Sequence, residues 1–171
     1  MKFLIISDIH DNLVNLEKCL NWGRNQGIEN AVCAGDVVNS DTLAYLAKNF
    51  KTIYLVRGNL EIYDEAEVGQ YKNIKYLGRF GVFEIDGKTV GLYHEPWFIK
   101  KVAAHCHAPL KKCDIIFYGH THRPWLEEKN GVMMANPGTL GGVFFKATFA
   151  VWDSVGAAGQ PPLELKILEL L

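Results

Sequence analysis

The stretch KFLIISDIH, residues 2–10, decides the fold class of this chain. Its first part, Lys2 to Ser7, is a continuous apolar run, which is typical of a β-strand buried on both faces. Polar residues then end the strand. From Asn12 to Gln26 leucines recur at helical spacing, and Asp11 or Asn12 can cap the helix. The stretch therefore predicts a strand, a polar turn and a helix.

The same alternation continues downstream. A second strand is predicted at Ala31–Ala34, and Ser40 or Asp41 can cap a second helix. A third strand is predicted at Thr52–Val56. Strands that alternate with helices predict parallel strands joined by crossover helices, which is the organisation of an α/β fold.

The second half of the chain is richer in hairpins. The predicted elements are strands at Val82–Ile85 and Thr89–Tyr93 around Asp86-Gly87, a helix at Trp97–His107, a strand at Ile115–Tyr118, strands at Trp125–Glu128 and Val132–Ala135 around Asn130-Gly131, and a final pair at Val143–Trp152 and Leu163–Leu170. The strand count predicts two sheets, with the first half parallel and the second half more antiparallel.

Composition limits the class of protein. The 171 residues suit one compact domain, and a net charge of -1 predicts no bulk attraction to nucleic acid or to anionic membranes. Met1–Ile6 is too short for a signal peptide. The 4 cysteines show no CxxC pairing, so we expect reduced thiols in a cytoplasmic protein.

The segment Gly119-His120-Thr121-His122 carries two histidines at the end of the strand predicted at Ile115–Tyr118. A small residue separates them, so both imidazoles can point toward one place. Neutral imidazole is the commonest metal ligand. Taken alone, the pair is equally compatible with two surface histidines.

Further side chains of metal-ligating type lie close to the carboxyl ends of predicted strands. These segments are Asp8-Ile9-His10, Gly35-Asp36, Gly58-Asn59 and His94. Ligands collect at such strand ends in open α/β sheets. Carboxylate and amide oxygens with several imidazoles suit Mn²⁺, Fe, Ni²⁺ or Zn²⁺ better than Ca²⁺ or Cu⁺. Each segment alone also fits an ordinary turn, but their common placement predicts a metal site.

The order D-x-H, GD, GN, H and GHTH resembles the calcineurin-like metallophosphoesterase superfamily, and within it the small single-domain bacterial and archaeal phosphodiesterase branch. The resemblance runs from Ser7 to about Thr139 and includes Ser7–Asn12, Val56–Asn59 and Asn136-Pro137-Gly138. It implies an α/β sandwich of two facing mixed β-sheets flanked by helices, in a single domain over residues 1–171.

The resemblance also implies a site for two divalent metal ions bridged by Asp36, with Mn²⁺ expected first and Ni²⁺, Fe or Zn²⁺ as alternatives. The other ligands that it implies are Asp8, His10 and His122 for the first ion, and Asn59, His94 and His120 for the second. A hydroxide held between the ions would attack a small phosphodiester in line with its leaving group. No residue is assigned a catalytic role beyond this bridging by Asp36.

The chain departs from the family pattern beside the expected ligands. Leu60 stands where many members have a histidine, so help to the leaving group worth about 10²–10⁴-fold would be missing. Glu95-Pro96 follows His94 where relatives often have Gly-His, so Glu95 would add negative charge to the pocket rim. Whether Glu61 reaches the site stays open. Trp97 is expected to pack on a helix, with a role as a platform for a base as the alternative.

Two alternatives to an enzyme of small phosphodiesters remain. A retromer subunit resembles the same fold and acts chiefly through partner surfaces, so Leu60 and Glu95 leave open a protein-binding scaffold with weak or no catalysis. A nuclease would need a basic groove, for which the chain offers only a small cluster of lysines at positions 100, 101, 111 and 112. The intact ligand set argues against the scaffold. The net charge of -1 argues against a nucleic-acid polymer or a membrane as partner, so a small-molecule phosphodiester is the expected substrate. The sequence names neither the substrate nor the oligomeric state.

Overall fold

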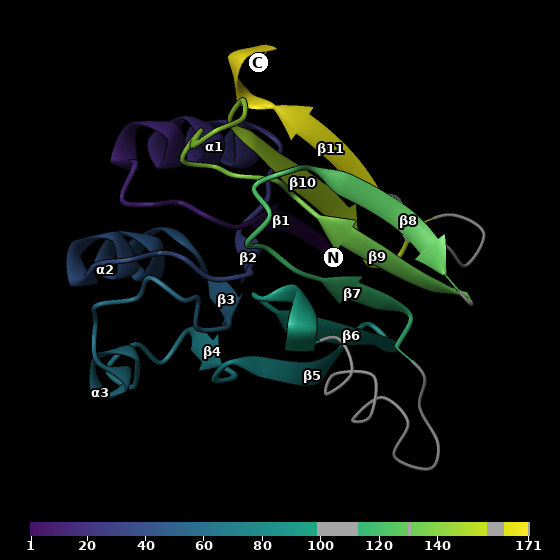
Figure 1. Ribbon diagram of the computed structural model, residues 1–171, viewed down its shortest axis with the longest axis horizontal. Coiled ribbons are helices and arrows are strands. Elements are labelled where there is room, and N and C mark those ends of the chain that lie inside the picture. Colours follow the sequence, from purple (N-terminus) through teal and green to yellow (C-terminus); the bar gives the residue numbers. More distant parts are fainter. Residues whose placement is uncertain (99–112, 130, 157–162, 171) are drawn as a thin grey trace.

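Two β-sheets pack face to face in the computed structural model, which describes all residues except 99–112, 130, 157–162 and 171 (Figure 1). The helices α1 (Leu13–Asn25), α2 (Ser40–Asn49) and α3 (Glu65–Val68) lie on the outer side of one sheet. This arrangement confirms the predicted α/β sandwich of two mixed sheets with helices outside.

The first sheet contains the parallel strands of the predicted β-α-β alternation. In spatial order its strands are β11 (Leu163–Ile167), β10 (Thr148–Asp153), β1 (Lys2–Ile6), β2 (Asn30–Cys33), β3 (Thr52–Leu55) and β4 (Ile74–Tyr76). Strands β1 to β4 run parallel, whereas β10 and β11 are antiparallel to their neighbours. The sequence pattern missed α3 and β4, because four-residue and three-residue elements are too short to show periodicity.

The second sheet combines two hairpins with one lone strand. Its spatial order is β5 (Phe80–Ile85), β6 (Lys88–Tyr93), β7 (Ile115–Phe117), β9 (Val132–Asn136) and β8 (Trp125–Lys129). Both hairpins are antiparallel, as predicted, but β7 pairs in parallel with β6 and β9 on its two sides. The second half of the chain is therefore more mixed than its hairpins alone predict.

The residues of β1 pack into two separate cores, which explains its continuous apolar run. Leu4 and Ile6 belong to the core beneath the helices, and Phe3 and Ile5 to the core between the sheets. In the second core the fully buried Trp152 lies 5.6 Å, centroid to centroid, from Phe3. Burying each such side chain contributes about 1.5–3 kcal/mol to the stability of the fold. Strand β1 therefore helps to hold both the helices and the second sheet in place.

Two predicted boundaries differ from the structure. The side chain of Asn39, rather than Ser40 or Asp41, caps α2 by accepting a hydrogen bond from the Thr42 amide at 3.0 Å. The strand predicted from Val143 begins only at Thr148. Gly142 and Phe144 have φ angles of 76° and 65°, which interrupt extended backbone before that point.

The helix predicted at Trp97–His107 lies mostly outside the described residues. Its first two positions are described, and they belong to a short 3₁₀ turn at Pro96–Phe98. The lysine cluster at 100, 101, 111 and 112 also lies outside them. Cys19 and Cys33 are buried free thiols, but Cys113 is disulfide-bonded, so the expectation of four reduced thiols is wrong. Within the described ranges, no helix combines the length and apolar character needed to cross a membrane.

Candidate metal centre

Loops that follow five strands carry the predicted ligands to one place. Asp8 and His10 follow β1, Asp36 follows β2, Asn59 follows β3, His94 follows β6, and His120 and His122 follow β7. Backbone hydrogen bonds join the first two loops, since the Asp8 amide donates to Gly35 O at 3.0 Å and the His10 amide donates to Asp36 O at 3.1 Å. The two sheets thus contribute to a single cluster.

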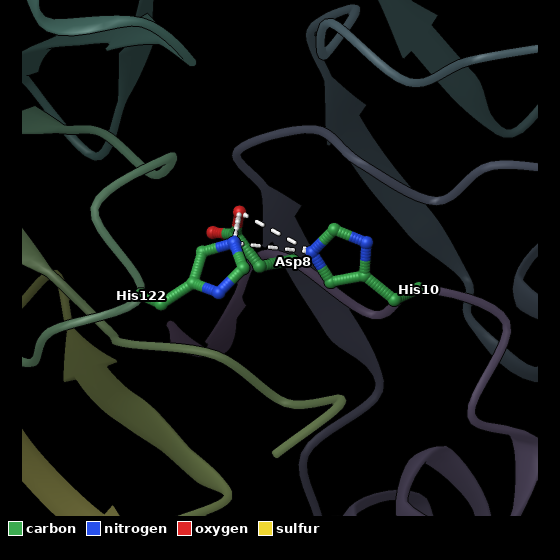
Figure 2. A group of neighbouring side chains, drawn as sticks. All are labelled: Asp8, His10 and His122. Atoms are coloured by element: carbon green, nitrogen blue, oxygen red, sulfur yellow. Dashed lines mark hydrogen bonds and ion pairs between the residues drawn. The ribbon is translucent and has the colours of Figure 1, made fainter. Parts of the chain in front are cut away.

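One half of the cluster consists of Asp8, His10 and His122 (Figure 2). Asp8 Oδ1 lies 3.1 Å from His122 Nε2 and 3.8 Å from His10 Nε2, and the two Nε2 atoms are 3.1 Å apart. Asp8 is fully buried, and in the described part of the chain its Oδ1 has no well-aligned hydrogen-bond donor. Three potential ligand atoms therefore converge from two loops, around a buried carboxylate oxygen whose bonding capacity is unused.

The other half contains Asp36, Asn59, His94 and His120. His94 Nε2 lies 3.3 Å from Asp36 Oδ2 and 3.0 Å from Asn59 Oδ1, and His120 Nδ1 lies 2.8 Å from the same Asn59 oxygen. Asp36 Oδ2 is also 4.0 Å from His10 Nε2. All seven predicted side chains are thus connected, and the Asp36 carboxylate lies between the two halves.

Backbone carbonyls fix the orientation of two imidazoles. His94 Nδ1 donates to Ala34 O at 2.6 Å, and His122 Nδ1 donates to Val143 O at 3.2 Å. A carbonyl can only accept, so these contacts place the proton on Nδ1 and leave the lone pair of Nε2 facing the cluster. This is the arrangement in which proteins present histidine to a metal ion.

Much of the cluster has left-handed backbone. The φ angles of Asp8, His10, Asp36, His120 and His122 are 53°, 48°, 53°, 68° and 59°. Such conformations cost about 1–3 kcal/mol each outside glycine and concentrate at functional sites. The strain turns these side chains inward immediately after their strands.

Glycines provide the space for this close approach. A Cβ atom on Gly119 would lie 2.0 Å from Ser7 Oγ and 2.9 Å from Asp8 Oδ2. A Cβ atom on Gly58 would lie 2.0 Å from Asp36 Oδ1. Because neither position has room for a side chain, the glycines of the GN and GHTH segments are required by packing around the carboxylates.

The electrostatics of the cluster favour positive charge. Burial opposes charge on Asp8 and Asp36, but contacts of Asp8 with His10 and His122, and of Asp36 with His94, outweigh it, so the pKa of both carboxyls lies below the usual range. The close contact with the ionised Asp8 carboxylate raises the pKa of His122. Burial lowers the pKa of His94, yet Asp36 more than compensates and raises it. The anionic oxygens thus remain ionised and attract cations.

Glu61 holds the loops rather than joining the ligands. Its buried carboxylate accepts hydrogen bonds from the amides of Gly58 at 3.0 Å, Val37 at 3.2 Å and Val38 at 2.7 Å. These amides belong to the loops after β2 and β3, which carry Asp36 and Asn59. Glu61 therefore fixes the spacing between two ligand loops, a role that its position in the sequence did not reveal.

Asn136 has a similar role for the loop that carries His120 and His122, and this role was also missed. Its buried Nδ2 donates to Gly119 O at 2.9 Å and to Thr121 Oγ1 at 3.0 Å. Its Oδ1 accepts from the Gly138 amide at 2.8 Å. The Asn-Pro-Gly motif was visible in the sequence, but its partner, the GHTH loop, becomes apparent only in the folded chain.

The residues that depart from the family pattern have distinct surroundings. Glu95 is only 2 % exposed and its Oε1 lies 3.3 Å from Arg79 Nη1, so its charge has a partner and does not stand free at the rim. Trp97 is 62 % exposed and meets the His120 ring at 5.3 Å, which contradicts the expected packing on a helix. Leu60 is half exposed beside the site, where its amide donates to Asp36 Oδ1 at 3.0 Å.

The family model for the calcineurin-like phosphoesterase superfamily domain matches residues 1–155. Among solved structures, a novel archaeal phosphodiesterase superposes with a TM-score of 0.80 at 22 % identity, covering 97 % of this chain and 100 % of its own. YfcE, a phosphoesterase from E. coli, superposes with a TM-score of 0.67 at 20 % identity, covering 98 % of this chain and 100 % of its own. Vps29 from Entamoeba histolytica, complexed with Zn²⁺, superposes with a TM-score of 0.67 at 22 % identity, covering 98 % of this chain and 99 % of its own. At these identities the likeness concerns the fold.

Proposed function

This chain belongs to the calcineurin-like phosphoesterase superfamily, and from that premise we propose that it is a metal-dependent phosphodiesterase acting on a small phosphodiester. The observation that carries the proposal is the convergence of seven ligand-type side chains from five loops on one cluster. A phosphoesterase and a phosphodiesterase among the structural relatives agree with this chemistry.

The residues present fit a pair of divalent ions. Ligand atoms of Asp8, His10 and His122 lie within 4.8 Å of one another, as do those of Asp8, Asp36 and His94. We assign Asp8, His10 and His122 to one ion and Asn59, His94 and His120 to the other, with Asp36 shared. Two carboxylates would offset part of the charge of the ions, and the mixed oxygen and nitrogen set suits Mn²⁺, Ni²⁺, Fe or Zn²⁺.

Bound ions would supply Lewis acidity and a hydroxide nucleophile at neutral pH, and would neutralise the charge that develops on the phosphoryl oxygens. The protein residues position the reaction. His94 and His122 are oriented by backbone carbonyls. Leu60 offers no proton to the leaving group, so we expect a preference for diesters whose leaving group is stable as an anion.

The test is hydrolysis of bis(p-nitrophenyl) phosphate by protein stripped with a chelator and reloaded with Mn²⁺ or Ni²⁺, with metal content measured on the same sample. We expect turnover in the loaded protein and its loss in Asp36→Asn. Asp41→Asn, on the exposed first turn of α2, is the matched control and should retain activity. Protein that demonstrably holds two equivalents of metal and hydrolyses no diester would disprove the proposal.

A protein-binding scaffold is the second candidate, because Vps29 shares the fold and Leu60 lacks the expected proton donor. A scaffold with a degraded site should purify with little metal and should show unchanged partner binding in Asp36→Asn. The undisturbed ligand geometry favours the enzyme. Our expectations of one domain over residues 1–171 and of a cytoplasmic location stay predictions.

A further inference from the structure

Two exposed aromatic side chains contact histidines of the metal cluster. Trp97 is 62 % exposed, and its ring meets His120 edge-on, with centroids 5.3 Å apart and an interplanar angle of 76°. Phe144 is 89 % exposed, and its ring lies 5.7 Å from that of His122 at an angle of 32°. A ligand that covers large exposed apolar rings beside a polar site removes their surface from water, which favours its binding.

The loop that carries Phe144 is held in place by the cluster itself. Val143 O accepts the hydrogen bond from His122 Nδ1 at 3.2 Å, so the residue before Phe144 is attached to an expected ligand. Phe144 has a φ of 65°, which is unusual for a bulky residue. Since its side chain is almost fully exposed, packing within the chain does not account for its position.

The two rings contact histidines that belong to different halves of the cluster. His122 contacts Asp8 at 3.1 Å in one half, and His120 contacts Asn59 at 2.8 Å in the other. The Asp36 carboxylate lies between these halves. A phosphoryl group held at the centre would therefore have an aromatic ring available on each side, one for each of its ester substituents.

Building on the proposed phosphodiesterase activity, we propose that Trp97 and Phe144 determine specificity by each packing against one ester group. The substrate class that this arrangement fits is a phosphodiester with a planar aromatic group, such as a nucleobase or an aryl ring, on both sides of the phosphorus. Stacking of this kind tolerates many rings because every aromatic group has a π-face.

Two substrates with the same leaving group separate the roles of the rings. Bis(p-nitrophenyl) phosphate keeps an aryl group after cleavage, and methyl p-nitrophenyl phosphate keeps only a methyl group. We expect Trp97→Ala and Phe144→Ala each to lower kcat/KM for the diaryl ester by about three- to tenfold, mainly through KM. For the methyl ester, only the variant whose ring faces the leaving group should show the loss.

Matched variants distinguish ring contact from damage to the fold. Trp97→Phe and Phe144→Tyr keep a ring and should restore most of the diaryl activity. Trp125→Ala and Phe145→Ala remove exposed aromatic residues with no ring contact to a ligand histidine in the described chain, and should leave both substrates unchanged. Equal losses on both substrates for both test variants, or no loss for either, would overturn the assignment.

Binding provides a readout that does not depend on turnover. Adenosine monophosphate should quench tryptophan fluorescence of the metal-loaded wild type, and the quenching should disappear in Trp97→Phe. Inorganic phosphate, which has no ring, should not quench. If the wild type hydrolyses diesters but Trp97→Phe is quenched like wild type, the specificity assignment fails alone. If the wild type hydrolyses no diester, the proposed function fails, and the quenching decides the subsite separately.

Discussion

Gly119 shows how little space surrounds the Asp8 carboxylate. A Cβ atom there would lie 2.0 Å from Ser7 Oγ and 2.9 Å from both Asp8 Oδ2 and His94 Nδ1. We expect Gly119→Ala to destabilise the protein by about 1–3 kcal/mol and to reduce bound metal, measured by urea unfolding and elemental analysis.

Gly69→Ala is the matched control, since its new Cβ would meet nothing closer than 3.5 Å. It should change stability by less than about 0.5 kcal/mol. A Gly119→Ala protein as stable and as metal-rich as Gly69→Ala would show that the site tolerates movement of the GHTH loop.

Leu60 is a place where activity can be gained. Its side chain is 47 % exposed, and only its backbone amide is used, by Asp36 Oδ1. Leu60→His should therefore fold normally and supply a proton donor, raising kcat for a diester with an alkyl leaving group by roughly 10- to 100-fold. The measurement compares alkyl and p-nitrophenyl leaving groups. Leu60→Gln, polar but unable to transfer a proton, should show no such gain; an equal gain in both would contradict general-acid help.

The histidine pKa values set the pH dependence of metal binding. Contacts with Asp8 and Asp36 raise the pKa of His122 and His94 above 6.5, so in the metal-free protein their protonation stabilises the fold below pH 6.5 and this contribution is lost as pH rises through the raised values. Because the pKa of Asp8 and that of Asp36 are lowered, the ionised carboxylates stabilise the fold above pH 3.8. This stabilisation is lost only as the pH falls through the lowered pKa values.

Metal ions require neutral imidazole, so protons compete with them. We expect Mn²⁺ to bind more tightly as pH rises from about 6 to 8 and to release protons on binding. Calorimetric titration in buffers of different ionisation enthalpy measures both effects, and His122→Asn should release fewer protons. An affinity that does not vary over this range would contradict the expectation.

The residues that follow strands in D-x-H, GD, GN and GHTH could be identified in the sequence because parallel strands bring their carboxyl ends together. Glu61 and Asn136 could not, because their roles depend on backbone amides and carbonyls of segments far away in sequence. Trp97 was misjudged for the same reason: the sequence does not show that His120 lies beside it.

At the scale of elements, Glu61 couples the loops after β2 and β3. Glu61→Ala would leave the buried amides of Val37 and Gly58, and that of Val38, without their acceptor. We expect a loss of about 2–4 kcal/mol in unfolding free energy together with weaker metal binding, measured by urea unfolding and Mn²⁺ titration. Glu128→Ala, on the exposed strand β8, is the control and should be nearly neutral. If Glu61→Ala leaves the metal affinity unchanged, the hydrogen bonds of Glu61 do not position the proposed ligands.

Long elements were predictable and short or interrupted ones were not. The α1 helix follows its helical periodicity closely because it buries one apolar face, and strands β1 to β3 follow the apolar runs from which they were predicted. The late start of β10 reflects the left-handed backbone at Phe144, which no propensity indicates for an aromatic residue.

At the scale of the whole molecule, the cluster joins the two sheets, because the proposed ligands follow β1, β2 and β3 of one sheet and β6 and β7 of the other. Metal that binds only the folded chain stabilises it by about 2.7 kcal/mol at a hundredfold excess over Kd. For a protein of this size we expect a rise in Tm of about 5–10 °C with Mn²⁺, measured by calorimetry. Chelator should reverse the rise and Asp36→Asn should lack it. An equal rise in that variant would mean binding elsewhere.

The facing of the two sheets was implied by family resemblance and not by the strand pattern itself. The relative placement of the sheets depends on which large side chains meet in the core between them. There Trp152 contacts both Phe3 and Phe117. Pairing of β7 between β6 and β9 is likewise a long-range choice that local periodicity does not encode.

Strand β1 lies between β2 and β10, so it pairs both with an early strand and with a late one. On the ribosome, β1 and β2 can pair soon after they emerge, whereas the other edge of β1 stays unpaired until β10 has been synthesised. His10 and His122 are separated by 112 positions. A nascent chain is therefore unable to assemble the proposed ligand group of Asp8, His10 and His122 until translation has passed His122.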